Sequence, residues 1–213
     1  MSESSDSAKG EANRVKPASG RFDQTSIILH WLTVLLIAVQ FSSAWLHETV
    51  DHNSNIAAAL LDTHRNSGVL IWIIATARLI WRRNCAYLPP FPASMPKLQQ
   101  AIAKANEYSL YAVLLVQPIT GVGGVLLRGK PFDLFIWEVP ALFESDDAIR
   151  HLFEEAHELG ANALLALIGL HAGAALFHYF VLRDGVLQRM LPWTSQPVRV
   201  PEADAPLAVS DVE

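Results

Sequence analysis

The 213-residue chain has almost no cysteine and little charge. Its one cysteine, Cys85, excludes an intrachain disulfide and a cluster of thiolate metal ligands, so any bound metal would be held mainly by histidine. Charged residues make up 17% of the chain, which is low for a soluble protein, while 51% of the residues are hydrophobic. The net charge is only −5, and no basic patch of the kind that binds nucleic acid is present. These absences favour a membrane protein.

The apolar residues gather in long runs. Four of these runs reach or approach the roughly 20 residues that a membrane-spanning helix needs. A soluble helix bundle is the competing interpretation, but it would give every helix a polar face, and segments such as LIWIIATARLIW have none. The sequence therefore predicts an all-α, integral membrane four-helix bundle, with helices at about 27–46, 60–81, 108–127 and 155–182.

The predicted helices belong to one domain, residues 21–192, between two polar segments, residues 1–20 and 193–213, that we predict to be disordered tails. The connection LPPFPASMP between the second and third helices is too rich in proline to be helical. Residues 145–158 predict a helix with Ser145 as its N-cap, which runs directly into the fourth apolar helix.

Lysine and arginine are unevenly distributed among the connections. Twelve of the sixteen lie in the N-terminal segment, in the connection between the second and third helices, or in the C-terminal segment. Because cytoplasmic loops of membrane proteins carry an excess of positive charge, this distribution predicts that both termini are cytoplasmic. The remaining four lie in the two opposite connections: Arg65, Arg128, Lys130 and Arg150.

Four histidines lie on the predicted membrane helices: His30, His64, His157 and His171. An ionisable side chain inside a membrane is costly, so each one indicates a functional role. His157 and His171 share one helix, roughly 21 Å apart along its axis and on nearly the same side. The predicted orientation sorts the four into an outer pair, His64 with His157, and an inner pair, His30 with His171. Each pair can hold one flat macrocycle from opposite faces, and bis-histidine iron suits electron transfer because it has no open coordination position.

His178 is an alternative to His171 in the inner pair. It follows His171 by seven residues on the same helix face, and its depth matches His30 slightly better. Its bulky neighbours Phe177, Tyr179 and Phe180 argue against a macrocycle there, whereas His171 lies among small residues in IGLHAGAA. Small residues also let helices approach closely, so the pattern by itself leaves both histidines open.

Four segments resemble bacterial cytochrome b-561 proteins. They are RFDQTSIILHW from residue 21, HRNSGVLIWIIATARLIWR from residue 64, YAVLLVQPITG from residue 111, and HELGANALLALIGLHAGAALFHYFVLRDGVLQRMLP from residue 157. The resemblance implies that His30, His64, His157 and His171 are the metal ligands, in place of His178, and that they bind two b haems. It also implies a location in the bacterial cytoplasmic (inner) membrane and electron transfer with the quinone pool. A superoxide:quinone oxidoreductase is the enzyme activity this suggests, superoxide being one proposed donor on the periplasmic side.

Arginines near the inner pair are candidates for binding the haem propionates, because guanidinium matches carboxylate in a bidentate way. The candidates are Arg21, Arg78 and Arg82, with Arg78 best placed because it lies within a helix. The alternative role for these arginines is to anchor the helix ends at the cytoplasmic face of the membrane, as positive residues commonly do. The start of the third helix departs from the family pattern, since Lys104 and Glu107 stand in a segment where many members carry histidines.

Other functions fit parts of the same pattern. The closest is the cytochrome b membrane anchor of a larger dehydrogenase or hydrogenase complex, which would use a similar bundle and quinone chemistry. A haem-free four-helix transporter, with His and Arg lining a proton path, belongs to a different class and would be colourless. A regulatory or lipid-binding membrane scaffold explains the fewest of these sequence features. The expected partners are a quinone and the lipid bilayer, no nucleic acid is expected, and a homodimer is left open.

Overall fold

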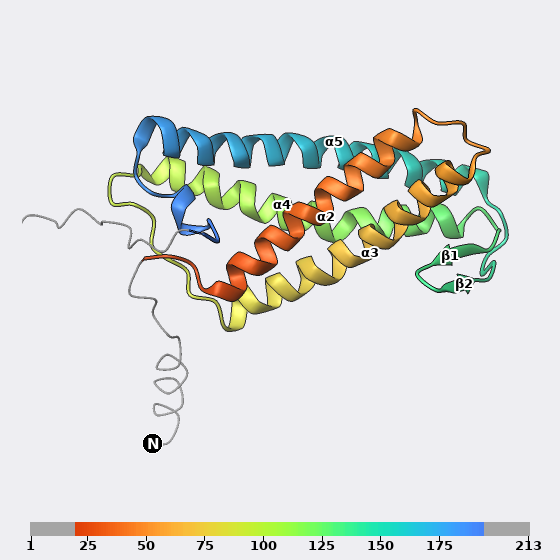
Figure 1. The fold of residues 1–213 in the computed structure, drawn as a ribbon, viewed down its shortest axis with the longest axis horizontal. Coiled ribbons are helices and arrows are strands. Elements are labelled where there is room, and N and C mark those ends of the chain that lie inside the picture. The colour runs from red at the N-terminus through yellow and green to blue at the C-terminus, as the bar shows by residue number, and fades with distance from the viewer. Residues whose placement is uncertain (1–19, 194–213) are drawn as a thin grey trace, which may run out of the picture.

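The computed structural model describes residues 20–193, and its long elements are all helices (Figure 1). Both predicted tails lie outside the described residues, apart from Gly20 and Trp193. A short antiparallel hairpin connects two of the helices, and short π and 3₁₀ helices follow the last one. The elements are α2 (Gln24–His47), α3 (Asn55–Asn84), α4 (Lys97–Leu126), β1 (Phe132–Leu134), β2 (Trp137–Val139), α5 (Asp147–Phe177), η1 (His178–Leu182) and η2 (Leu187–Arg189).

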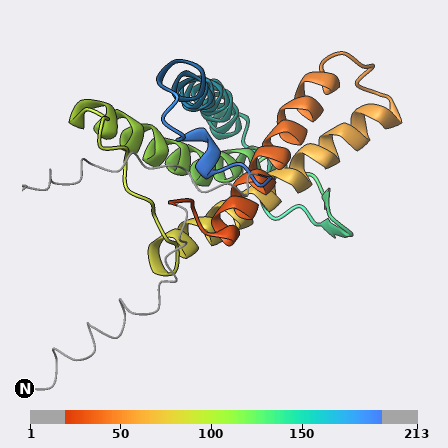
Figure 2. The same ribbon diagram turned by 60° about the vertical axis from the view of Figure 1, so that its left-hand side comes forward.

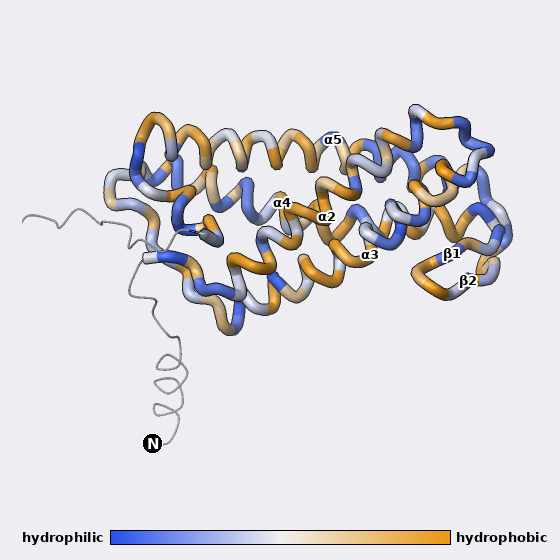
Figure 3. Tube along the Cα trace, viewed as in Figure 1, coloured by the Kyte–Doolittle hydropathy of each residue, from blue (hydrophilic) through white to orange (hydrophobic). Residues whose placement is uncertain are grey.

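Three helices of the described part are long and apolar enough to cross a membrane: α2, α4, and α5 with its extension to Leu182. The sequence predicted a fourth such span, but α3 carries more polar residues (Figure 3). Many of these polar groups bond within the protein. Asp62 accepts from Arg65 at 3.0 Å, and the Ser67 hydroxyl donates to the Gln40 side chain at 2.5 Å. Polar side chains of α3 therefore form hydrogen bonds within α3 and with α2. A hydropathy profile of the sequence does not take these bonds into account.

The observed helix starts differ from the predicted ones, because polar turns beyond the apolar runs are also helical. The third helix begins at Lys97, directly after the proline-rich connection, rather than near residue 108. The second begins at Asn55, where the Ser54 hydroxyl accepts from the Ala57 amide at 3.1 Å. The prediction of Ser145 as N-cap is wrong by one residue, since Asp146 accepts from the amides of residues 148 and 149.

The helices are arranged as two antiparallel pairs, α2 with α3 and α4 with α5, joined by packing of α3 on α4 (Figures 1 and 2). Among the described residues, α2 and α5 pack far less closely than these neighbours. The buried core lies near the middle of the helices and consists of Ile71, Ala75, Leu114 and Leu164. Partly buried residues of α2, including Leu36 and Phe41, pack against it. The space between α2 and α5 is therefore closed at mid-length by apolar side chains.

Asp23 ties the start of α2 to the end of α3. Its carboxylate accepts from the Ser26 amide at 3.0 Å, the Trp81 indole at 2.9 Å and the Tyr87 amide at 3.2 Å. Burial disfavours the charged carboxylate, but these hydrogen bonds outweigh that effect and hold the pKa of Asp23 below its usual value of 3.8.

We expect Asp23→Ala to lower the free energy of unfolding by roughly 1–2 kcal/mol at neutral pH, because an N-cap and its cross-helix bonds are lost. Since the folded pKa is lowered, the contribution is fully present above the unfolded pKa and disappears as pH falls through the folded pKa. Thermal unfolding in detergent, followed by helical circular dichroism, measures the loss. Asp23→Asn is the matched control because Asn caps helices well. An unchanged unfolding midpoint for Asp23→Ala would contradict the expectation.

Candidate functional site

The structure brings the four predicted ligands together as two pairs. His64 of α3 faces His157 of α5, and His30 of α2 faces His171 of α5. In each pair the ring centroids are 6.1 Å apart, with interplanar angles of 75° and 60°. A metal between two imidazoles needs a centroid separation of roughly 6 Å, which is two metal–nitrogen bonds of about 2 Å plus half of each ring. Both pairs therefore fit bis-histidine coordination.

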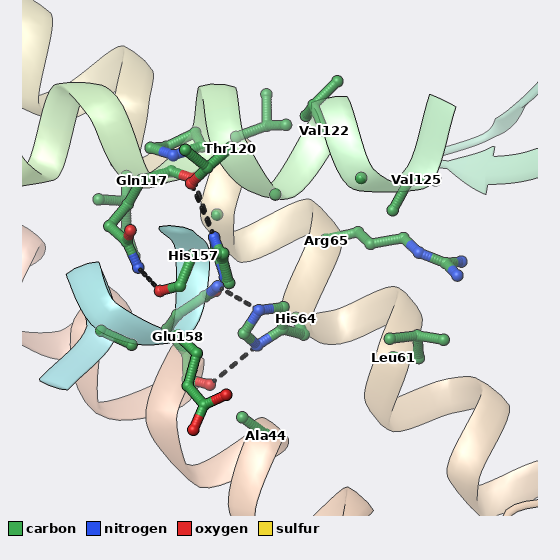
Figure 4. Close-up of a pocket in the computed structure, with 18 of the residues that line it drawn as sticks. Ala44, Leu61, His64, Arg65, Gln117, Thr120, Val122, Val125, His157 and Glu158 are labelled. Atoms are coloured by element: carbon green, nitrogen blue, oxygen red, sulfur yellow. Dashed lines mark hydrogen bonds between the residues drawn. The ribbon is translucent and has the colours of Figure 1, made fainter. Parts of the chain in front are cut away.

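The outer pair lines a cavity of about 530 Å³. This is within the range of roughly 300–1,000 Å³ typical of sites for cofactors and drug-sized ligands. Most of its lining is apolar, with residues from all four long helices and from β1, including Ile37, Val69, Leu114, Phe132 and Leu164. The imidazoles of His64 and His157 enter this cavity from two helices (Figure 4). The donor set and its apolar surroundings suit a planar prosthetic group.

Backbone carbonyls hold both outer histidines in one tautomer. His64 Nδ1 lies 3.2 Å from the Gln40 carbonyl, and His157 Nδ1 lies 3.1 Å from the Gln117 carbonyl (Figure 4). Because a carbonyl only accepts, each Nδ1–H donates and each Nε2 keeps its lone pair. The Gln40 amide lies 2.9 Å from His64 Nε2 and donates to it in this tautomer. The Nδ1–H bonds to carbonyls are of the kind that orient metal-ligating histidines and raise their basicity, whereas the Gln40 amide takes the position on His64 Nε2 that a metal would occupy.

The inner pair has a different environment. His30 Nδ1 is buried and has no hydrogen-bond partner among the described residues. Arg78 is near enough to interact electrostatically with both His30 and His171, and its guanidinium lies 5.5 Å from the centroid of the Tyr111 ring. Arg21 instead donates to the Leu191 carbonyl at 2.5 Å. Arg78 therefore lies close to both histidines of the inner pair.

His178 has partners of its own at the same end of the molecule. It is buried in η1, with Nδ1 2.5 Å from the Asp184 carboxylate and Nε2 3.1 Å from the Gln99 amide. The histidine that faces His30 is His171. Geometry therefore separates the two candidates that depth along the sequence left open.

Comparison with known proteins agrees with this geometry. Residues 21–193 match the family model described as prokaryotic cytochrome b561. The chain belongs to this family. It is accordingly a bacterial membrane protein that binds haem b and transfers electrons.

Curated relatives match this cytochrome over nearly their whole length. It is 31% identical to "Cytochrome b561 homolog 1" of Escherichia coli strain K12 over 175 residues, which cover 81% of this chain and 97% of the relative. It is 26% identical to "Probable superoxide oxidase CybB" of Yersinia pestis over 172 residues, covering 81% and 96%. It is 27% identical to "Cytochrome b561 homolog 2" of Escherichia coli strain K12, covering 80% and 91%.

The two histidine pairs of this cytochrome are separated by the buried core. Leu164 is seven residues from His157 and seven from His171 on α5, so it lies midway between the pairs. Ile71 and Leu114 meet it from α3 and α4. An apolar layer therefore lies between the two histidine pairs.

Several residues that orient the histidines were not identified from the sequence. Gln40 and Gln117 act through backbone carbonyls, which no sequence motif encodes. A signal was nevertheless present, because each is a polar residue within an otherwise apolar run, LIAVQF and LLVQP. Thr120 adds a second contact, its hydroxyl lying 3.1 Å from His157 Nδ1.

Glycine at position 121 leaves room for the His157 ring. A Cβ at this position would lie 3.0 Å from His157 Cε1, closer than most real contacts. We expect Gly121→Val to displace the ring and lower the haem content, at a cost of roughly 1–3 kcal/mol for overpacking. Haem b content per chain, measured on purified protein, tests this.

The control for Gly121→Val is Ile119→Val, a change at a lipid-facing position two residues away whose side chain is 57% exposed. It is expected to keep full haem content. Equal haem content in the two variants would show that Gly121 has no part in the site.

Proposed function

We propose that this protein is a di-haem b cytochrome that passes single electrons between a donor on the periplasmic side and the quinone pool. Superoxide is a candidate donor, which would make the activity that of a superoxide:quinone oxidoreductase. The observation that carries the proposal is the pair of equally spaced histidine couples, His64 with His157 and His30 with His171, each 6.1 Å between ring centroids. The printed name of one relative, a probable superoxide oxidase, supports superoxide as the donor.

In this proposal four helices form the membrane bundle, both termini are cytoplasmic and the membrane is the cytoplasmic one. His64 and His157 then hold the outer haem, and His30 and His171 the inner haem. Three spans long enough to cross and the excess of Lys and Arg at one end of the bundle support this arrangement. Haem b supplies a one-electron iron couple when bound.

The residues of this chain bind the haems, orient the imidazoles that hold them, and exclude water from the path between them. The carbonyls of Gln40 and Gln117 fix the outer imidazoles with Nε2 unprotonated, and the Gln40 amide that now bonds to His64 Nε2 would turn away when a metal takes its place. Arg78 provides positive charge beside the inner pair and is the first candidate to bind haem propionates there, with Arg21 as the second. The core around Leu164 keeps the path between the pairs dry.

Quinone chemistry also needs protons, because each quinone takes up two protons with two electrons. A cavity of about 440 Å³ at the inner end is lined by Gln99, His178 and Asp184 together with apolar residues. The His178 ring enters this lining with its Nδ1 bonded directly to the Asp184 carboxylate. We place the quinone head group in this cavity, where Gln99, His178 and Asp184 offer hydrogen-bonding partners for its oxygens.

The test is made on purified protein reconstituted with ubiquinone. We expect a b-type absorption band that appears on adding quinol, and reduction of quinone when superoxide is generated outside. A colourless protein would contradict the proposal and favour a haem-free transporter. A stably co-purifying metal-cluster subunit would instead favour the membrane anchor of a dehydrogenase or hydrogenase.

A further inference from the structure

The hairpin between α4 and α5 has one apolar and one acidic face. In its antiparallel register Leu134 pairs with Trp137, and Asp133 pairs with Glu138. Paired residues share a face and alternate along a strand, so the two carboxylates point away from the apolar side chains. The apolar face comprises Phe132, Leu134, Trp137 and Val139.

The tip of the hairpin exposes large apolar side chains. Ile136 is 87% exposed and Trp137 is 68% exposed. Leu142 and Phe143, just beyond β2, are also mostly exposed. The tip residue Phe135 has φ of 55°, a left-handed conformation that turns ordinarily give to glycine. A clustered apolar surface of this kind marks contact with a membrane or another protein.

The hairpin lies beside the helices, not above their ends. The Phe135 amide donates to the Asn66 side chain at 2.8 Å, which fixes the tip against α3. The next residue, Ser67, bonds to Gln40, so the tip is about level with residue 40 of α2. From there α2 continues to His47, roughly 10 Å further along its axis. The tip therefore reaches back along the bundle toward its middle (Figure 1).

The end of α2 beyond this level exposes large apolar side chains. Trp45 and Leu46, nearer the end of the helix than Gln40, are 60% and 52% exposed and belong to a helix long and apolar enough to span the membrane. A tip held level with Gln40 is thus within the outer part of the bilayer. Lys130, which precedes β1, adds positive charge where the chain leaves α4, while Arg128 is paired with Glu154 at 3.6 Å.

We propose that the β1–β2 hairpin is an interfacial anchor that lies in the headgroup region of the bilayer, with its tip and Trp137 against lipid. Tryptophan is enriched at this depth because its ring is amphipathic. The free edges of a two-stranded sheet exclude the hydrocarbon core itself, where unpaired backbone groups are not tolerated. Asp133 and Glu138 on the opposite face remain in water.

This placement has a consequence for the outer cavity. Phe132 and Leu134 line that cavity from the same apolar face, and the Phe132 ring lies 5.8 Å from the Arg65 guanidinium. A hairpin held by lipid therefore keeps one wall of the outer cavity closed. The inference depends on the chain spanning a membrane and not on the identity of its electron donor or acceptor.

Cys85 is the one cysteine of the chain and is exposed, so replacing it allows a fluorophore to be attached at a single chosen position. In a Cys85→Ser background, Ile136→Cys and the matched control Glu138→Cys are each labelled with an environment-sensitive fluorophore and placed in lipid nanodiscs. Quenching by nitroxide lipids and by aqueous iodide is then compared. An unchanged haem absorption spectrum in both variants shows that each is folded.

We expect the probe at position 136 to be quenched by nitroxide lipid at least about twofold more than the probe at 138, with the order reversed for iodide. Equal access of iodide to both probes would overturn the proposal by placing the tip in water. Shielding of position 136 from both quenchers would also overturn it, because a protein partner would then cover the tip.

Discussion

His171→Ala is expected to halve the haem b content of the purified protein, whereas His178→Ala is expected to leave it unchanged. His171 faces His30 with 6.1 Å between ring centroids, while His178 is bonded to Asp184 and Gln99. Loss of one axial ligand leaves the inner haem with a single histidine and an apolar void, so its binding should fail. The two variants differ only in which histidine of the same helical segment is removed.

Haem content is measured as pyridine haemochrome per chain, with low-spin signals in electron paramagnetic resonance identifying the haem that remains. His178→Ala also serves as a test of stability, because it removes a buried side chain at the same end of the molecule. If His178→Ala lost a haem and His171→Ala kept both, the assignment of the inner pair would be wrong.

His64→Ala is expected to remove the outer haem, while the inner haem stays reducible by quinol. His64 is bonded to the Gln40 carbonyl and faces His157 in the outer cavity. Loss of a supporting group alone typically costs 10–100-fold in metal affinity, so loss of a ligand should slow reduction by the outer donor by more than about tenfold.

Stopped-flow absorption follows reduction of the haem by superoxide and, separately, by quinol in reconstituted protein. His151→Ala is the control, because His151 lies near the same end of α5 as His157 with its side chain 67% exposed. Retained reduction by the outer donor in His64→Ala would contradict the direction of electron flow. Loss of quinol reduction alone would place the quinone at the outer haem.

The sequence predicted the helices and the pairing of histidines because both follow from regular geometry. Fourteen residues on one helix fix the axial spacing of His157 and His171, and the direction of each helix fixes the end at which His30 and His64 lie. Comparison with known proteins confirmed the family that the segments around these histidines suggested. The choice between His171 and His178 needed that resemblance, since depth alone favoured the wrong neighbour for His30.

Features that depend on contacts distant in the sequence were not predictable. The carbonyls of Gln40 and Gln117 contact the outer histidines only because α2 and α4 pack beside α3 and α5. The hairpin was missed because each strand has three residues, too few to show an alternating pattern. Its amphipathic character and its depth follow from pairing and from the bond between Phe135 and Asn66.

The number of b haems bound per chain tests the central claim most directly. The purified, unmodified protein is analysed for haem by pyridine haemochrome and for iron, and both are divided by protein concentration from amino-acid analysis. Two haems per chain, both low-spin, are the predicted result. One haem per chain, or none, would contradict the assignment of His64 with His157 and His30 with His171 as two separate haem sites.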